Sequence, residues 1–188
     1  MLPIFLLLAV LGMATLADRR VRAGVLAIAV ALGLVASASN VTTNRTQAGQ
    51  VAAAINAAAK PGDVVGYCPD QLGPSVSRLL PNNLVQLTFP AGAAPQRVDW
   101  YDYSARNAAG QPAAFARTLA SRAGPGHTIW LVWISGYKTL DFKCETLSSQ
   151  LAGLRPGATQ VVRPDTNAHD DLTGVFEQQA LFRYPAAP

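Results

Sequence analysis

Two uncharged apolar runs near the start of the chain limit what it can fold into. The first occupies residues 2–17 and the second occupies residues 23–39, and neither contains a charged side chain. As a helix, each run is about 25 Å long, which is at the short end of what crosses a bilayer. Neither run keeps the polar face of a soluble helix. The pattern therefore predicts a transmembrane helical hairpin over residues 1–39.

Two alternatives to this hairpin stay open. One is a buried hairpin in a globular protein, and the other is a cleaved signal peptide. A signal peptide begins with a basic segment, whereas Met1 leads directly into apolar residues and the basic cluster follows the first run. A signal peptide would also leave the second run without a role.

Basic residues between the two runs predict the orientation. Arg19, Arg20 and Arg22 lie in the short connection, and the next basic residues are Arg45 and Lys60. Short connections rich in Lys and Arg stay in the cytoplasm. We therefore expect a cell-membrane protein with the lipid bilayer as a partner and residues 40–188 extracytoplasmic. An outer N-terminus is natural for the tail of a longer polytopic protein, so the chain is interpreted as a fragment, with a true start at Met1 as the alternative.

The two cysteines agree with an outer location. Cys68 and Cys144 are far apart in the sequence, and neither belongs to a cluster with metal-ligand spacing. In an oxidising compartment such a pair predicts one disulfide bond. A bond that closes so long a loop stabilises by about 4 kcal/mol in the chain-entropy treatment. Two separately buried thiols are the alternative.

The rest of the chain alternates between helical and strand-like segments. A polar linker is expected at residues 40–46, followed by a domain at residues 47–188. Helices are expected at 47–59, 74–80, 112–122 and 144–154, and strands at 64–68, 84–89, 129–134, 159–163 and 175–184, with a short extended piece at 98–100. This alternation predicts a layered α/β domain, Rossmann-like, with a mostly parallel sheet. The strand at 129–134 is apolar on both faces and is expected at the centre, and the last strand is expected antiparallel at an edge.

Ligands of open α/β sheets bind beyond the carboxyl ends of the strands. Residues 68–74 and 135–138 are expected there, which makes Asp70, Gln71 and Tyr137 candidates for ligand binding. Asp102 follows the second strand at some distance and is a further candidate. Asp70 has a structural alternative as a turn or cap residue, and Tyr137 has one as an aromatic residue at the rim.

No catalytic residue, cofactor or metal is predicted. Gly66 and Gly73 do not form a phosphate-binding loop, and neither a Gly-x-Ser-x-Gly elbow nor a His-Glu-x-x-His motif occurs. His169 lies among aspartates in residues 167–171, and a polar loop is the favoured interpretation there over a metal site. The net charge of +4 is scattered rather than gathered in a basic stripe, so no nucleic-acid partner is expected.

A resemblance to a known family adds to this reading. Residues 60–65, Lys-Pro-Gly-Asp-Val-Val, and 67–74, Tyr-Cys-Pro-Asp-Gln-Leu-Gly-Pro, follow the two apolar runs. With the apolar strand at 129–133 and Gly136-Tyr137, they resemble the C-terminal part of actinobacterial polytopic glycosyltransferases of the GT-C class. That class is similar to mannosyltransferases that use polyprenyl-phosphate sugars, and the resemblance covers most of the chain.

The resemblance implies a role in the cell envelope without the catalytic step. In that class the catalytic acidic residue lies in the first outer loop of a much longer membrane domain, and nothing in this chain corresponds to it. We therefore expect an extracytoplasmic domain that assists acceptor binding or structure, with a polyprenyl-phosphate sugar or an envelope glycan acceptor as partner. A stand-alone membrane-anchored binding or scaffold protein of the envelope is the alternative.

Overall fold

The computed structural model describes residues 10–187 except 13, 16, 138 and 169–175. Contacts within the chain divide it into two units, Met1–Thr43 and Asn44–Pro188. The boundary falls inside the segment that the sequence marks as a linker. Each unit is described by itself below.

The first unit contains the long helix α2, Arg19–Thr42. Asp18 precedes it and its carboxylate accepts a hydrogen bond of 2.7 Å from the backbone N–H of Arg20, which explains why the helix begins there. The three arginines between the apolar runs therefore lie in the first turn of α2. The sequence had indicated a loop at this position. The helix also extends three residues into the expected linker.

One helix in the described part of the chain is long and apolar enough to cross a membrane. It is α2, whose segment Arg19–Ala38 has a mean hydropathy of 2.1. The apolar run at residues 2–17, expected as the first half of a hairpin, lies largely outside the described residues, so one apolar helix is shown and not two. An N-terminal signal sequence has the same properties as a membrane anchor.

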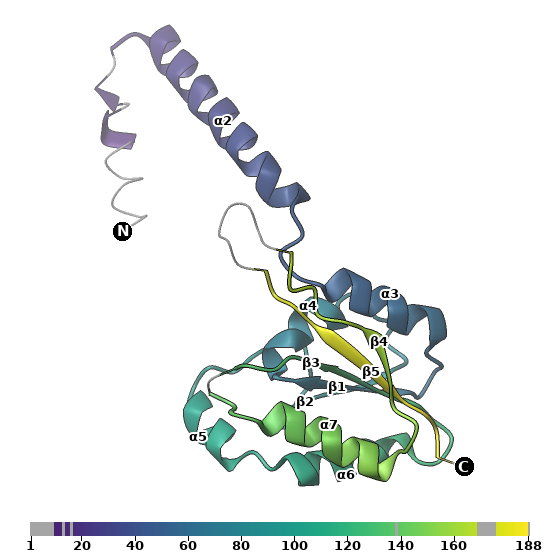
Figure 1. Ribbon diagram of the computed structural model, residues 1–188. Coiled ribbons are helices and arrows are strands. Elements are labelled where there is room, and N and C mark those ends of the chain that lie inside the picture. The colour runs from purple at the N-terminus through teal and green to yellow at the C-terminus, as the bar shows by residue number, and fades with distance from the viewer. Residues whose placement is uncertain (1–9, 13, 16, 138, 169–175, 188) are drawn as a thin grey trace. The chain divides into compact units, whose positions relative to one another are not determined.

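The second unit is an α/β domain built on a five-stranded mixed sheet (Figure 1). The strand order is β2-β1-β3-β5-β4, with the two parallel neighbours of β1 on either side of it. The bounds are β1 Val64–Cys68, β2 Val85–Thr88, β3 Ile129–Trp133, β4 Thr159–Val162 and β5 Ala180–Tyr184. The expected α/β class is confirmed, and β3 lies at the centre of the sheet as the sequence predicted.

The position of β5 differs from the expectation. It is antiparallel to β3, as predicted, but it lies between β3 and β4 instead of at an edge. Its side chains are buried on both faces: Leu181 packs in one hydrophobic cluster and Tyr184 in the other. Strand β4 takes the edge, where the first three of its four side chains are exposed. A strand with two apolar faces belongs inside a sheet, because an edge strand exposes part of its surface to water.

Helices cover both faces of the sheet (Figure 1). Helices α3, Ala48–Ala58, and α4, Gly73–Ser77, contribute to one cluster of buried side chains. Helices α6, Pro112–Ala123, and α7, Lys143–Leu154, contribute to the other. A helix that the sequence did not indicate, α5, spans Tyr103–Ala109, and residues 98–100 form no strand.

The predicted disulfide bond is confirmed. Cys68 and Cys144 are joined, and both are buried, with 0% and 2% of their surface exposed. The bond links the last residue of β1 to the first turn of α7, so it ties the sheet to the helix layer. The apolar helix and the disulfide bond together indicate a secreted or membrane-anchored extracytoplasmic domain.

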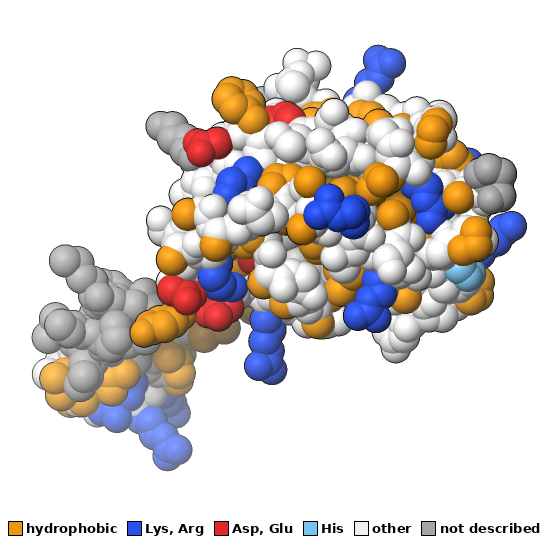
Figure 2. Space-filling view, turned by 90° about the horizontal axis from the view of Figure 1, so that it is seen from below, with side chains coloured by type: hydrophobic (Ala, Val, Ile, Leu, Met, Phe, Trp, Pro, Cys, Tyr) orange, Lys and Arg blue, Asp and Glu red, His pale blue; other side chains and the backbone are white. Residues whose placement is uncertain are grey.

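Basic side chains on one face of the domain lie apart from one another. Figure 2 shows this face with Lys and Arg separated by neutral and apolar surface. The arrangement matches the scattered charge of the sequence, whose net value is +4.

Candidate functional site

The chain changes direction across the sheet between β1 and β3. Strand β1 is followed by α4 and by β2 on one side, whereas β3 is followed by α7 and by β4 on the other side. The connections after these two neighbouring parallel strands thus lead in opposite directions. Such a switch point opens a crevice at the carboxyl ends of the strands, where ligands of α/β domains bind.

Asp70 lies at this switch point, directly after β1. It begins a short 3₁₀ helix, η1, Asp70–Leu72, and only 4% of its surface is exposed. Its carboxylate accepts a hydrogen bond of 2.8 Å from the phenol of Tyr103 in α5. Burial raises the pKa of Asp70 above its ordinary value of 3.8, while the bond from Tyr103 and the positive charge of Arg106 act in the opposite direction.

Asp102, unlike Asp70, has an exposed carboxylate. It precedes α5 with a left-handed backbone, and its exposed carboxylate lies 2.9 Å from Nε of Arg106. The Arg106 guanidinium lies 5.9 Å from the centre of the Tyr103 ring. Asp102 therefore takes part in a surface ion pair, which contributes little to stability.

The residues before β5 bring a second acidic side chain to the same edge. Because β5 runs antiparallel to β3, its amino end lies at the carboxyl ends of the parallel strands. The Glu177 carboxylate accepts a hydrogen bond of 2.7 Å from the Gln179 amide, which also donates to Ser75 over 3.4 Å. Burial raises the pKa of Glu177 above its ordinary value of 4.5, and the hydrogen bonds from Gln179 and Ser75 lower it.

Tyr137 follows β3 and lies within electrostatic range of both acidic side chains. Burial raises the pKa of its phenol, and the negative charges of Glu177 and Asp70 raise it further. The phenol therefore stays protonated and can donate a hydrogen bond. Asp70 and Glu177 thus both act on Tyr137, whereas Asp102 lies at the surface in its ion pair with Arg106.

Two amide oxygens near this cluster are buried without a hydrogen-bond partner in the described part of the chain. They are Oε1 of Gln71, in η1, and Oε1 of Gln179, before β5. Buried polar atoms in native proteins nearly always have a partner. Both oxygens are acceptors, so the partner that they lack is a hydrogen-bond donor.

Two shallow depressions lie beside the switch point. One has a volume of about 200 Å³ and is lined by Gly136, Tyr137, Asp141, Phe142 and Glu145. In it, Oε2 of Glu145 is a third buried acceptor without a partner among the described residues. Tyr137 therefore lines this depression and also lies within electrostatic range of Asp70 and Glu177.

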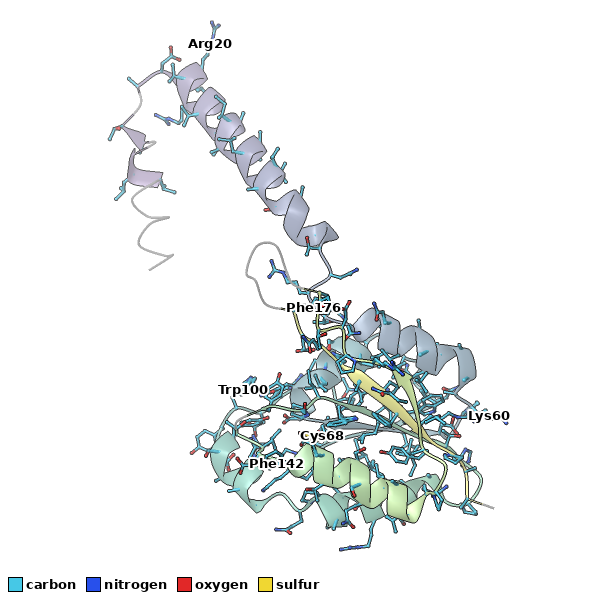
Figure 3. The ribbon with its side chains drawn as sticks, in the orientation of Figure 1. Arg20, Lys60, Cys68, Trp100, Phe142 and Phe176 are labelled. Atoms are coloured by element: carbon cyan, nitrogen blue, oxygen red, sulfur yellow. A yellow bond between two sulfur atoms is a disulfide. The ribbon has the colours of Figure 1, made fainter. Side chains whose placement is uncertain are left out.

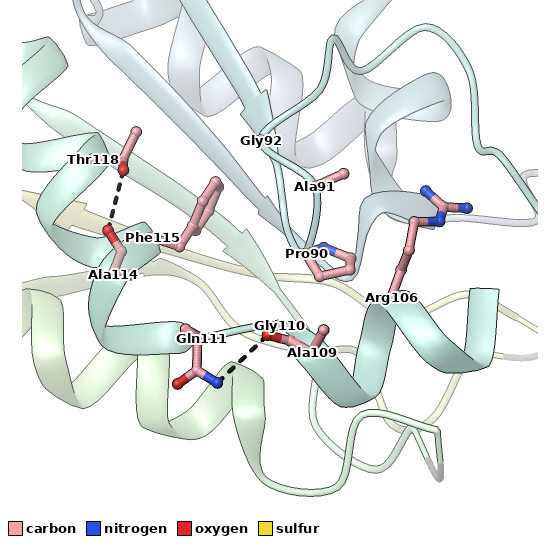
Figure 4. Close-up of a pocket in the computed structure, with 10 residues that line it drawn as sticks. All are labelled: Pro90, Ala91, Gly92, Arg106, Ala109, Gly110, Gln111, Ala114, Phe115 and Thr118. Carbon is pink, nitrogen blue, oxygen red and sulfur yellow. Dashed lines mark hydrogen bonds between the residues drawn. The ribbon is translucent and has the colours of Figure 1, made fainter. Parts of the chain in front are cut away.

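The other depression is larger, at about 520 Å³, and lies between the turn after β2 and the helices α5 and α6 (Figure 4). Its polar side chains already have backbone partners: Gln111 donates to the carbonyl of Ala109 and Thr118 donates to the carbonyl of Ala114. Arg106, at its rim, is paired with Asp99 and Asp102. This depression therefore offers fewer unsatisfied groups to a ligand than the cluster around Tyr137.

Within the described residues, no group of three or more His, Cys, Asp or Glu side chains is arranged to hold a metal ion. The segment 169–171, which carries His169 and two aspartates, lies outside the described residues. His127 lies 3.5 Å from the buried carboxylate of Asp63, which also accepts hydrogen bonds from Thr128 and Trp130. Those bonds connect the start of β1 with the start of β3, so Asp63 has a structural role.

Two residues of the site were not indicated by the sequence, Glu177 and Gln179. Tyr103, like Asp102, follows the second predicted strand at some distance, but the helix α5 on which it lies was not revealed by the apolar pattern. Glu177 and Gln179 lie before a strand whose amino end reaches the site only because that strand is antiparallel. The predicted direction of β5 was the signal that would have placed them at this edge.

Comparison with known proteins finds no family model, curated sequence or solved structure that matches this chain.

Proposed function

We propose that residues 44–188 form a glycan-binding domain on the extracytoplasmic side of a membrane. The observation that carries the proposal is the cluster at the switch point, where Asp70, Glu177 and Tyr137 adjoin the unpaired amide oxygens of Gln71 and Gln179. These groups are mainly hydrogen-bond acceptors, and a sugar presents many hydroxyl donors. Asp70 and the two amide oxygens are buried, so contact with a ligand falls to Tyr137 and Glu177, which are half-buried.

The negative charge of the cluster favours one of the two ligands that the sequence suggested, the glycan acceptor, over the other, the polyprenyl-phosphate sugar. The negative charges of Asp70 and Glu177 disfavour a phosphate group beside Tyr137, whereas the half-buried Glu177 can accept hydrogen bonds from a neutral, hydroxylated ligand. The proposed ligand is therefore the glycan acceptor and not the polyprenyl-phosphate sugar.

The test measures glycan binding by the full chain in lipid nanodiscs, with envelope oligosaccharides as probes and saturation-transfer NMR as the readout. Two isosteric substitutions, Glu177→Gln and Tyr137→Phe, remove charge or a donor at the site, and each is expected to weaken binding about tenfold, the equivalent of one strong hydrogen bond. Asp99→Asn is the matched control, because Asp99 is an exposed carboxylate in a surface ion pair. Absence of binding at millimolar concentration, or equal binding by all three variants, would refute the proposal.

The membrane attachment belongs to the same proposal. We propose two membrane passes, with the arginines between them in the cytoplasm and the domain outside. Cysteines introduced at Arg20 and at Lys60 of the full chain distinguish the sides in intact cells. A membrane-impermeant thiol reagent is expected to label position 60 and not position 20, and labelling of both positions, or of position 20 alone, would contradict the topology.

We propose that this domain is the terminal segment of a larger membrane glycosyltransferase whose transfer step takes place elsewhere in the protein. The support is the resemblance of residues 60–74 and 129–137 to the C-terminal part of the GT-C class. The reading frame upstream of this sequence tests it. Further apolar spans, with an acidic pair after the first, would support the proposal, and a frame without them would favour an independent envelope binding protein.

A further inference from the structure

The chain enters the domain beside the candidate site. The backbone N–H of Glu177 donates a hydrogen bond of 2.8 Å to the carbonyl of Arg45, and the N–H of Gln47 donates one of 3.0 Å to the carbonyl of Glu177. Thr46 forms a parallel bridge with the same residue. Residues 45–47, the entry segment, therefore run alongside Glu177, which forms the acidic cluster together with Asp70.

The side chain of Gln47 holds this entry segment in place. It is 2% exposed, and its amide oxygen accepts hydrogen bonds from the backbone N–H groups of Asp165, over 2.8 Å, and Gln179, over 2.9 Å. Its amide nitrogen donates to the carbonyl of Arg163 over 3.0 Å. One buried side chain thus fastens the entry segment to the ends of β4 and β5.

The connection to the apolar helix is short. Helix α2 ends at Thr42, and the second unit begins at Asn44. Two residues of extended chain reach about 7 Å at most. If α2 is embedded in a bilayer, its covalent link therefore keeps the entry segment, and with it Glu177, close to the lipid surface.

Exposed aromatic side chains occur in the segments that follow β2 and β3, toward the carboxyl end of the sheet. Trp100, Tyr101 and Phe142 have 64%, 84% and 78% of their surface exposed. Figure 3 shows Trp100 and Phe142 at the end of the domain opposite Lys60, which lies at the amino end of β1. Trp and Tyr favour the boundary between lipid and water, where the ring is apolar and its polar atom stays hydrated.

We propose that the carboxyl end of the sheet is a membrane-docking surface, formed by Trp100, Tyr101 and Phe142, that inserts into the lipid interface next to the entry segment. The bilayer is the partner because the chain attaches to an apolar helix at this same end. Docking there turns Tyr137 and Glu177 toward the lipid surface. The glycan ligand is then one that is carried on the membrane, a consequence that rests on the proposed function.

The docking test uses the full chain in nanodiscs. Because the only cysteines, Cys68 and Cys144, form a disulfide bond, a single introduced cysteine is a unique site for an environment-sensitive fluorophore. Tyr101→Cys and Phe142→Cys are expected to give blue-shifted emission that spin-labelled lipids quench several-fold more than emission from Lys60→Cys. Equal quenching at the three positions would overturn the docking surface.

A second variant tests the aromatic side chains themselves. Replacing Trp100 and Tyr101 with serine, with the label at position 142, is expected to reduce the quenching at 142 at least twofold. Circular dichroism of this variant serves as the folding control, since both side chains are exposed but the ring of Trp100 lies 5.0 Å from that of Tyr103. Unchanged quenching in a folded variant would show that these residues do not hold the surface at the membrane.

Glycan carried on lipid is then compared with the same oligosaccharide free in solution. Attachment to the same bilayer raises the effective concentration of ligand at a docked site, so we expect apparent binding at least about tenfold tighter for the glycolipid. Equal binding of the two forms would overturn the membrane-borne ligand while the proposed function stands. Failure of both forms to bind would refute the proposed function, and the fluorophore experiment would still decide the docking surface.

Discussion

The phenol of Tyr103 donates a hydrogen bond of 2.8 Å to the buried carboxylate of Asp70. The two residues belong to α5 and to η1, so the bond joins the segment after β2 to the segment after β1. Lys143 of α7 supports α5 from the other side, because its ammonium group donates to the carbonyls of Asn107, Ala108 and Gly110. The position of α5, and hence of Tyr103 at the candidate site, depends on these polar contacts.

Removing the phenol tests this contact. Tyr103→Phe leaves a buried carboxylate without its side-chain donor, so the free energy of unfolding is expected to fall by about 1–3 kcal/mol. The pKa of Asp70 is expected to rise further, because the bond that lowers it is lost. Urea denaturation of the full chain in detergent measures the stability. Tyr101→Phe is the control, since that side chain is exposed, and an equal loss in both variants would contradict the role of the bond.

The two site carboxylates predict a dependence of stability on pH. The pKa values of Asp70 and Glu177 are raised above the ordinary 3.8 and 4.5. A carboxylate with a raised pKa binds its proton more tightly in the folded state, so its contribution to stability is complete below the ordinary value and is lost as pH rises through the folded value. The variant with Asp70→Asn and Glu177→Gln should lack this loss.

The measurement is the difference in unfolding free energy between the native chain and this double variant from pH 3 to pH 8. We expect the native chain to lose stability relative to the variant as pH rises above the ordinary carboxylate values. Asp99→Asn, which removes an exposed carboxylate, gives the control curve. A difference that stays constant over the whole range would contradict the raised pKa values.

The disulfide bond predicts a large effect of reduction. Cys68 and Cys144 are separated by 76 residues, and a loop of this size accounts for about 4 kcal/mol in the chain-entropy treatment. Replacing both with alanine is expected to lower the unfolding free energy by about 2–5 kcal/mol. Reductant should destabilise the native chain to a similar extent and leave the double variant unchanged. Two free thiols in a non-reducing peptide map would contradict the pairing.

The buried side chain of Gln47 is expected to contribute to the stability of the domain. Gln47→Leu leaves the backbone N–H groups of Asp165 and Gln179 without an acceptor. Each unpaired group costs about 1–3 kcal/mol, so the variant is expected to be less stable by about 2–6 kcal/mol. Hydrogen exchange of the two amides should speed up. Gln50→Leu, at an exposed position whose side chain accepts a hydrogen bond from Gln47, is the control and should change little.

Much of the fold follows from local patterns in the sequence. The apolar run that forms β3 predicts a central strand, because a strand apolar on both faces needs neighbours on both sides. The apolar face of α6, with Phe115 and Leu119, predicts a helix packed on the sheet, and both side chains are buried. Helix α5 was missed because it is short and has polar groups, Tyr103 and Asn107, at its buried positions.

The candidate site was predictable only in part. Asp70 and Tyr137 directly follow two strands, so the switch-point rule placed them at the same edge. Asp102 was predicted on the same ground, yet the left-handed turn before α5 leaves its side chain at the surface with Arg106. Glu177 and Gln179 are distant from both segments in the sequence, and the pairing of β5 with β3 brings them to the site.

The sequence alone determined the apolar N-terminal segment, the α/β alternation and the disulfide bond, because hydrophobic patterning and cysteine number depend on residues that can be read locally. Only the tertiary structure decided the interior position of β5, the partners of Asp70 and the closeness of the entry segment to Glu177. Those features come from contacts between segments that are distant in the sequence, such as Asp70 with Tyr103, 33 residues apart, and Gln47 with Gln179, 132 residues apart. The pairing depends on which strand neighbours which, and no local pattern specifies that choice.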